Sequence, residues 1–319
     1  MADPSRLYVQ TLGQELPPQD TAAPSLFAEK VGRLARMIDD ADAVAVGIGS
    51  GMSTACGYDF YHGTELFEER LGAFGRAHGF STLFDGLYHV FSTPEEQWAF
   101  NLAVSGLVEG LPLGAPYERL ASLLEGKEHF VITTNVDGQV PRAFGPGRVW
   151  LFQGDLRYLQ CVQPCHGAVY PWREAAAAAL ESVATGPDGV PRVDGEALPR
   201  CPECNWLMAP WARDVNFCEG DMWRGQKEAY EGFLRRHLVE GSGRVLFLEL
   251  GVSSMTPAII KMPFWSMLAK NPRSTYACVN LGEESAPPIG AERSLTLTAD
   301  IGAVVDALWA SRGRYAAVR

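Results

Sequence analysis

The sequence lacks the features of a membrane or secreted protein. No run of about 18 apolar residues is present, which is the length a helix needs to cross a bilayer. The N-terminus at Met1 to Pro4 lacks the apolar core of a secretory signal. Basic residues are also few, since 27 Lys and Arg face 38 Asp and Glu and the net charge is −11. We therefore expect a cytoplasmic protein with neither a nucleic acid nor a membrane as partner, because both favour a basic face.

Cysteine is too scarce for a disulfide scaffold. The seven cysteines form an odd number in a chain of 319 residues, unlike the dense even sets of small secreted domains. The apolar fraction of 47% is ordinary for a globular core, so wholesale disorder is not expected. A chain of this length can hold one large domain or two small ones.

A loop rich in glycine and hydroxyl side chains lies at residues 49–57 and follows an apolar run at residues 43–48. Such a run is typical of a parallel strand buried on both faces. Glycines at its carboxyl end let the backbone approach a ligand and offer N–H groups to phosphate oxygens. The pattern predicts a nucleotide site, and the alternative is an ordinary tight turn.

The loop does not complete the usual dinucleotide fingerprint. Its third glycine position holds Thr54, and no strand ending in an acidic residue is expected about 20 residues later. Glu65, Glu68 and Glu69 fall near that distance, but in a stretch that indicates helix or loop. An ordinary dehydrogenase is therefore disfavoured.

The rest of the chain alternates between strand and helix patterns. This alternation predicts an α/β fold with a doubly wound, Rossmann-like parallel sheet. Two close pairs of cysteines add the expectation of a smaller zinc-binding and helical domain. Residues 58–92 show no clean period and are expected to be loop with short helices. Further strands are expected at 129–133, 149–152, 245–250, 276–279 and 295–297, and helices at 25–38, from 93 onward, at 117–124 and at 301–309.

These elements predict a division of the chain into four parts. We expect an N-terminal arm at 1–24, a helical insertion at 58–126, and a zinc-binding module with a connecting helix at 156–239. The Rossmann-like domain is expected to combine residues 25–57, 127–155 and 240–319.

Polar side chains follow two of the expected strands. Asn135 and Asp137 come after the strand at 129–133, and Gln153 ends the strand at 149–152. In an open α/β sheet, ligands bind at the carboxyl ends of the strands, so these residues are placed to face the glycine loop. The alternative for Asn135 and Asp137 is turn chemistry, because Asn and Asp often bond their own backbone in loops.

Four cysteines have the spacing of metal ligands. Cys161 and Cys165 bracket three residues, Cys201 and Cys204 bracket two, and 35 residues separate the pairs. Two close pairs of thiols suit a tetrahedral Zn²⁺, and four thiolates leave no open position, so we expect a structural zinc. His166 is a competing ligand, and coincidental cysteines in a reducing compartment are the alternative.

Together these segments resemble the sirtuin family over roughly residues 25–310. Residues 49–57 resemble its NAD-cradling loop, residues 133–137 its Thr-Gln-Asn-Ile-Asp signature, and residues 251–253 its Gly-Thr-Ser segment. The four cysteines match its zinc module, and Ala299-Asp300-Ile301 is similar to its adenine-side loop.

The departures from the family pattern point to one branch. The family's catalytic His-Gly is Gln153-Gly154 here, the first cysteine pair has three intervening residues, and residues 58–62 replace Ile-Pro-Asp-Phe-Arg. With residues 210–213 and 250–257, these changes resemble class M, the macrodomain-linked sirtuins. That resemblance implies NAD-dependent protein ADP-ribosylation of a lipoylated, glycine-cleavage-H-like carrier protein, with a macrodomain hydrolase as a possible further partner.

The resemblance also implies roles for individual residues. Asn135, Gln153, Asp137 and Arg213 would be catalytic, although a surface ion pair is the alternative for Arg213. The NAD-binding residues would be Gly49, Ser50, Gly51, Ser53, Gly57, Tyr61, Asn135, Asp137, Gln153, Gly251, Val252, Ser253, Asn280, Asp300 and Ile301.

A glutamine at position 153 changes the chemistry that is expected. A deacylase needs a base, and His serves because its pKa lies near neutrality, whereas the Gln amide stays neutral. Loss of general-base help typically costs about 10²–10⁴-fold in rate, so deacylation should be weak. ADP-ribosyl transfer is the leading hypothesis. The alternatives are NAD hydrolysis, weak deacylation, and a non-catalytic module that binds NAD or ADP-ribose.

Overall fold

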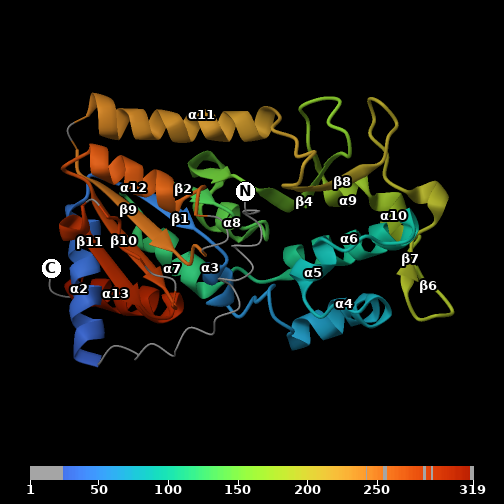
Figure 1. The fold of residues 1–319 in the computed structure, drawn as a ribbon, viewed down its shortest axis with the longest axis horizontal. Helices are drawn as coiled ribbons and strands as arrows, with labels where there is room; N and C mark the ends of the chain where they lie inside the picture. The colour runs from blue at the N-terminus through green and yellow to red at the C-terminus, as the bar shows by residue number, and fades with distance from the viewer. Residues whose placement is uncertain (1–23, 242, 254–256, 283–284, 289, 317–319) are drawn as a thin grey trace, which may run out of the picture.

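The core of the protein is a six-stranded parallel sheet with strand order β11-β10-β9-β1-β2-β3 (Figure 1). The computed structural model describes residues 24–241, 243–253, 257–282, 285–288 and 290–316, so most of the expected arm at 1–24 and residues 254–256 lie outside it. The strands are β1 (Ala43–Ile48), β2 (Glu128–Thr133), β3 (Val149–Leu151), β9 (Val245–Leu250), β10 (Thr275–Asn280) and β11 (Ser294–Thr298). The doubly wound fold predicted from the sequence is confirmed.

The strand order reverses direction between β1 and β9. Chain order runs outward from β1 through β2 to β3 on one side, and from β9 through β10 to β11 on the other. Ligands of such sheets bind at this switch point, beyond the carboxyl ends of the strands. Every residue of β1 and of β9 is buried, as expected for strands covered on both faces.

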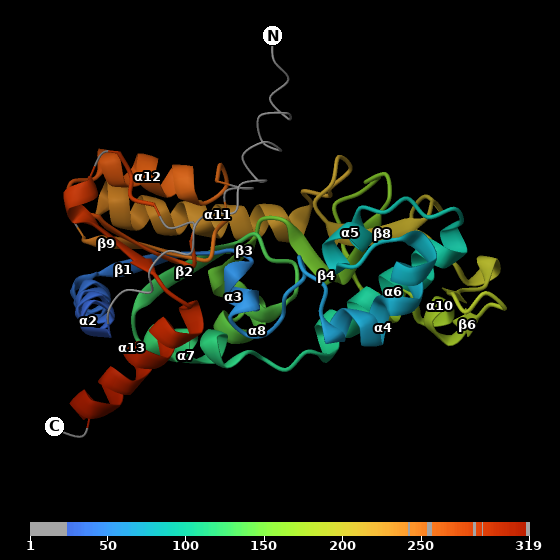
Figure 2. The ribbon, with the colours of Figure 1, turned by 60° about the horizontal axis from the view of Figure 1, so that its bottom comes forward.

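Helices cover both faces of the sheet (Figure 2). On one face lie α11 (Asp221–Arg235) and α12 (Lys261–Lys270), and on the other lie α7 (Ala115–Leu123), α8 (Gln139–Phe144) and α13 (Ile301–Ala316). The helix α2 (Pro24–Asp40) packs beside β11 and α13 and buries Val31, Leu34 and Ile38 at helical spacing. Gly47 lets α12 approach β1 closely, because a Cβ there would lie 2.2 Å from Ile260.

The second part of the molecule joins a helical layer to a small antiparallel sheet (Figure 1). The helices are α4 (Glu65–His78), α5 (Leu83–Leu87) and α6 (Pro94–Gly110). Thr93 caps the start of α6, because its hydroxyl accepts a hydrogen bond from the Glu96 N–H. The sheet has the order β5-β4-β8, with β4 at Gly154–Cys161, β5 at Tyr170–Pro171 and β8 at Met208–Ala212. The short elements α9 (Trp172–Ala175), α10 (Ala177–Glu181), β6 (Ala184–Thr185) and β7 (Pro191–Arg192) complete this end.

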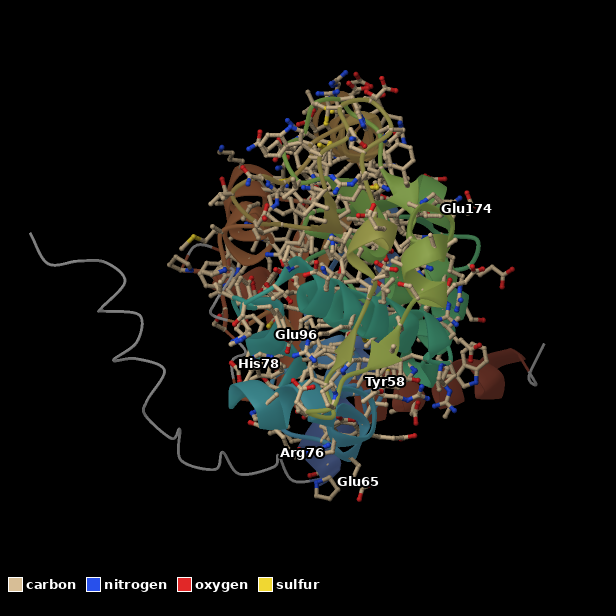
Figure 3. The ribbon with its side chains drawn as sticks, turned by 90° about the vertical axis from the view of Figure 1, so that its right-hand side faces the viewer. Tyr58, Glu65, Arg76, His78, Glu96 and Glu174 are labelled. Carbon is tan, nitrogen blue, oxygen red and sulfur yellow. The ribbon has the colours of Figure 1, made fainter. Side chains whose placement is uncertain are left out.

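A buried carboxylate ties three of these elements together. Glu96 on α6 is 4% exposed and pairs with the His78 ring at the end of α4 (Figure 3). Its other oxygen accepts a hydrogen bond from Arg192 on β7 at 3.2 Å. Since a buried charge is costly unless it is paired, this network fixes α6 relative to its neighbours.

The expectation of loop with short helices at residues 58–92 is wrong in part. Helix α4 is a regular element of 14 residues, capped by the Thr64 hydroxyl at its start and by Gly79 in the left-handed conformation at its end. Its apolar face includes glycines where the helix packs closely, and this weakens the periodic signal. Gly75 is one example, because a Cβ there would lie 2.6 Å from the Phe80 carbonyl oxygen.

Among the described residues, no helix combines the length and the apolar character that a membrane crossing requires.

Candidate cofactor and catalytic site

Two loops meet closely at the switch point of the sheet. The loop after β1 contains Gly49 and Gly51, and the loop after β9 begins with Gly251. The Gly51 N–H donates a hydrogen bond to the Gly251 carbonyl at 3.0 Å. A Cβ on Gly49 would lie 2.5 Å from that carbonyl oxygen, and Gly251 has a φ of +63°. Glycine is therefore required at this crossing because the two backbones pack against each other. The Gly49 and Gly51 N–H groups already donate to the Leu250 and Gly251 carbonyls at 3.0 Å, so these two are not the free donors that the sequence predicted for a phosphate.

Asn135 joins the β2 loop to the loop after β1. Its side-chain nitrogen lies 2.9 Å from the Gly49 carbonyl oxygen and 3.1 Å from each of the Ser53 and Tyr117 hydroxyl oxygens. The partners lie 18 to 86 positions from Asn135 in the sequence, so these are tertiary contacts. The alternative for Asn135, a hydrogen bond of its side chain to the backbone of its own turn, does not describe these contacts. Asn135 is 8% exposed and held in one place from three sides.

Asp137 lies beside Asn135 and is buried. One carboxylate oxygen accepts a hydrogen bond from the Ser53 hydroxyl, and the other accepts one from the Gln139 N–H at 3.1 Å. Burial raises the pKa of the Asp137 carboxyl, although both hydrogen bonds act in the opposite direction. An acidic group in this position favours a polar, cationic or hydrogen-bond-donating ligand.

Both residues line a cavity of about 390 Å³ that extends from the sheet edge into the helical part. Gln153 lies on the same wall, at the end of β3, and is half-buried. The following Gly154 has a φ of +89°, and a Cβ there would lie 2.1 Å from the Trp211 carbonyl oxygen of β8. The close approach of β8 therefore requires glycine after Gln153. The cavity brings together seven residues predicted from the sequence, namely Ser50, Ser53, Tyr61, Asn135, Asp137, Gln153 and Arg213.

Arg213 holds the chain at Gln153. The Nε and Nη2 atoms of its guanidinium donate to the Phe152 carbonyl oxygen at 3.1 and 2.9 Å. The backbone N–H of Arg213 donates to the Gln153 carbonyl oxygen at 3.0 Å. The guanidinium also pairs with Glu219 at 2.9 Å and lies 4.1 Å from the centroid of the Phe217 ring. The ion pair considered as an alternative is present, and the same group fixes the peptide that carries Gln153.

The other predicted cofactor residues lie outside this cavity. Asn280 donates to the Val252 carbonyl at 3.0 Å, which fixes the loop after β9, and Asp300 caps α13 by accepting a hydrogen bond from the Ala303 N–H at 2.8 Å. Asp300 lines a second hollow, together with Cys56 and Arg119. Gly57 and Ser253 lie in the segments after β1 and β9, and Ile301 is the first residue of α13. Their contact with a dinucleotide stays a prediction.

The four predicted metal ligands come together at the end of β4 and the start of β8. Their sulfur atoms all lie within 4.8 Å of one another, and the Cys161–Cys204 and Cys165–Cys201 distances are 3.5 and 3.6 Å. Tetrahedral zinc with bonds of about 2.3 Å requires sulfur atoms about 3.8 Å apart, so the cluster fits the ion. Burial raises the pKa of Cys201, but hydrogen bonds from the backbone of Cys204 and Glu203 and from His166 lower it to about 6.

The sequence patterns missed two residues of the site. Tyr117 on α7 is fully buried, and its hydroxyl contacts Ser53 and Asn135. Asn101 on α6 lines the cavity and is 8% exposed. Nothing in the spacing of either residue marks it, because each reaches the site only through the packing of its helix.

Comparisons with known proteins agree with this geometry. No family model matches the chain. A protein ADP-ribosyltransferase of Staphylococcus aureus is 32% identical over 274 residues, which is 84% of this chain and 83% of that protein. A probable bifunctional ADP-ribose hydrolase/ADP-ribosyltransferase of Fusarium oxysporum f. sp. cubense is 26% identical over 85% of this chain, which spans only 46% of that longer protein.

Solved sirtuin structures share the fold. One from work on sirtuin substrate affinity has a TM-score of 0.56 at 22% identity, covering 88% of this chain and 98% of that one. A mutant Sir2 homologue in complex with ADP-ribose has a TM-score of 0.56 at 17% identity, covering 90% and 98%. The chain therefore has the sirtuin fold and, given its identity with the staphylococcal protein, belongs to a family of NAD-dependent protein ADP-ribosyltransferases.

Proposed function

We propose that the protein transfers ADP-ribose from NAD to a lipoylated carrier protein in the cytoplasm, with release of nicotinamide. The observation that carries the proposal is Gln153, an uncharged amide in the lining of the cavity that Asn135 and Asp137 also line. The staphylococcal relative is named a protein ADP-ribosyltransferase, which supports the same reaction here.

We also propose that the chain divides into an N-terminal arm, a Rossmann-like domain, a helical insertion and a zinc-binding module with a connecting helix, with the residue ranges expected from the sequence.

In this reaction the bond between C1′ of the ribose and the nicotinamide nitrogen breaks, and its electron pair stays on nicotinamide. A lone pair of the acceptor side chain forms the new bond to C1′, and the acceptor gives up its proton. The dinucleotide would lie across the glycine crossing, with its nicotinamide end in the cavity. Asn135 and Asp137 are fixed by tertiary hydrogen bonds and would hold that end, while Gln153 would orient a ribose hydroxyl or the acceptor. Such fixed polar groups act without reorganisation during the reaction.

A macrodomain hydrolase that removes the modification is proposed as a further partner. One relative is named both a hydrolase and a transferase, and this chain spans less than half of it. That joint name supports a functional link between the two activities.

The function is tested by incubating the protein with NAD and a purified lipoylated carrier, followed by mass spectrometry. A gain of one ADP-ribose on the carrier is expected. Free ADP-ribose with unmodified carrier would favour NAD hydrolysis, and NAD binding without turnover would favour a non-catalytic module. Rapid deacylation of an acyl-lysine peptide would favour a deacylase.

Replacing Arg213 by lysine should lower the transfer rate about tenfold while NAD binding persists. Lysine keeps the charge but lacks the planar fork, so it cannot make both bonds to the Phe152 carbonyl, and Gln153 loses its fixed position. The test is kcat at saturating NAD, with Glu219→Gln as the matched control, because that change removes the ion pair and keeps the fork. A larger loss in the Glu219 variant would show that charge pairing is the main role.

A further inference from the structure

Asn101 is a buried amide that has no hydrogen-bond partner among the described residues. It is 8% exposed and lies on α6, in the wall of the cavity. Among the described residues, the side-chain polar atoms that are fully covered by protein and lack a partner are ring nitrogens of Trp150, Trp172, Trp265 and His237. The Asn101 amide also lacks a partner but is not fully covered, so its atoms are accessible from the cavity. A buried amide normally has a partner, and one that is left open to a cavity is poised to bond a ligand.

The face of α6 that carries Asn101 is fixed next to the segment that follows Gln153. Ser105 lies one turn after Asn101 on the same face, and its hydroxyl donates to the Leu156 carbonyl at 2.8 Å. Val108, a further turn along, lines the cavity as well. The polar group of Ser105 is therefore satisfied within the protein, whereas that of Asn101 is not. The contrast leaves an unused hydrogen-bonding group in the lining of the same cavity as Asn135 and Gln153.

The surroundings of Asn101 favour a neutral ligand. Much of the cavity wall is apolar and includes Phe84, Leu87, Val136, Leu156 and Ala209.

The charged residues in the cavity lining are already engaged. Asp137 is bonded to Ser53, and Arg213 to Phe152 and Glu219. Asp214 accepts a hydrogen bond from the Asn216 N–H at 2.8 Å. An ionised ligand group at Asn101 would lose its hydration without gaining a counter-ion.

We infer that Asn101 forms a subsite that recognises a neutral amide on an otherwise apolar arm of the acceptor. A side-chain amide can donate to the ligand carbonyl and accept from the ligand N–H at once, so an amide satisfies it better than a ketone, an ester or an alcohol. This inference rests on the proposed transferase function, because it assigns part of the same cavity to the acceptor.

The test uses two small probes that differ only in one group. N-hexylacetamide and 2-nonanone have the same chain length, with CH₂ in the ketone where the amide has N–H. Binding of each is measured by ligand-observed NMR titration in the presence of ADP-ribose, which fills the cofactor part of the site. The natural protein should bind the amide about fivefold more tightly. Asn101→Leu should remove that preference, and Asn101→Ser should do the same if the leucine variant does not fold.

A matched control is Gln97→Leu, because Gln97 lies one turn earlier on α6 but is exposed at the rim. The preference for the amide should persist in that variant.

The inference is overturned if the natural protein binds neither probe or shows no preference for the amide. It is also overturned if Asn101→Leu weakens the binding of both probes equally. Weaker binding of nicotinamide instead of the amide probe would overturn it as well, because the Asn101 side chain would then recognise the leaving group. Transfer to the carrier is assayed separately. Amide preference without transfer would refute only the function, and transfer without amide preference would refute only the subsite.

Discussion

Replacing Gln153 by alanine is expected to lower the rate of ADP-ribosyl transfer about 10²-fold or more while the fold persists. The side chain lines the cavity, and the substitution removes the group proposed to orient the ribose or the acceptor. Stability should change little, because Arg213 bonds the backbone carbonyl of Gln153, which alanine retains. Single-turnover transfer to the carrier measures the effect, and a thermal melt of the same sample verifies the fold. Activity equal to that of the natural protein would show that the side chain is a bystander.

Deacylation provides the complementary measurement. The natural protein should deacylate an acyl-lysine peptide about 10²-fold or more slowly than a sirtuin with histidine at this position, because the glutamine amide cannot take a proton. Comparable rates in the two proteins would contradict the role assigned to Gln153.

Replacing Cys201 by serine should release the zinc and lower the melting temperature by about 10 °C. A structural zinc stabilises its module through the free energy of binding, and loss of one of four ligands removes much of it. In a chain of 319 residues, the loss of several kcal/mol of unfolding free energy lowers the melting temperature by about 10 °C.

Metal content is measured by mass spectrometry of the purified protein, with Cys218→Ser as the matched control. Cys218 is also buried and near the cluster, but its sulfur donates to the His166 carbonyl, which a serine hydroxyl can do as well. The control should keep one zinc per chain. Absence of zinc from the natural protein, or its retention by Cys201→Ser, would show that the thiol cluster has been misinterpreted.

The strands and the metal ligands were accessible from the sequence because their signals are local. The run at residues 245–250 is predicted with the same ends that β9 has, since a fully buried parallel strand is a continuous apolar run. The spacing of the four cysteines predicts their convergence, because two thiols on one tight loop must share a metal. The helix α4 was missed in part because glycines at close contacts interrupt its apolar period.

The chain by itself determined the sheet, the glycine loop after β1 and the thiol cluster, because each depends on residue types at fixed short spacings. Only the tertiary structure decided that Tyr117 and Asn101 belong to the site and that Arg213 bonds the peptide of Gln153. The hydrogen bonds of Tyr117 and Arg213 join residues that are 18 and 61 positions apart, and Asn101 shares only the cavity lining with the other site residues. Their formation depends on how whole helices pack, and no local pattern of the sequence specifies that packing.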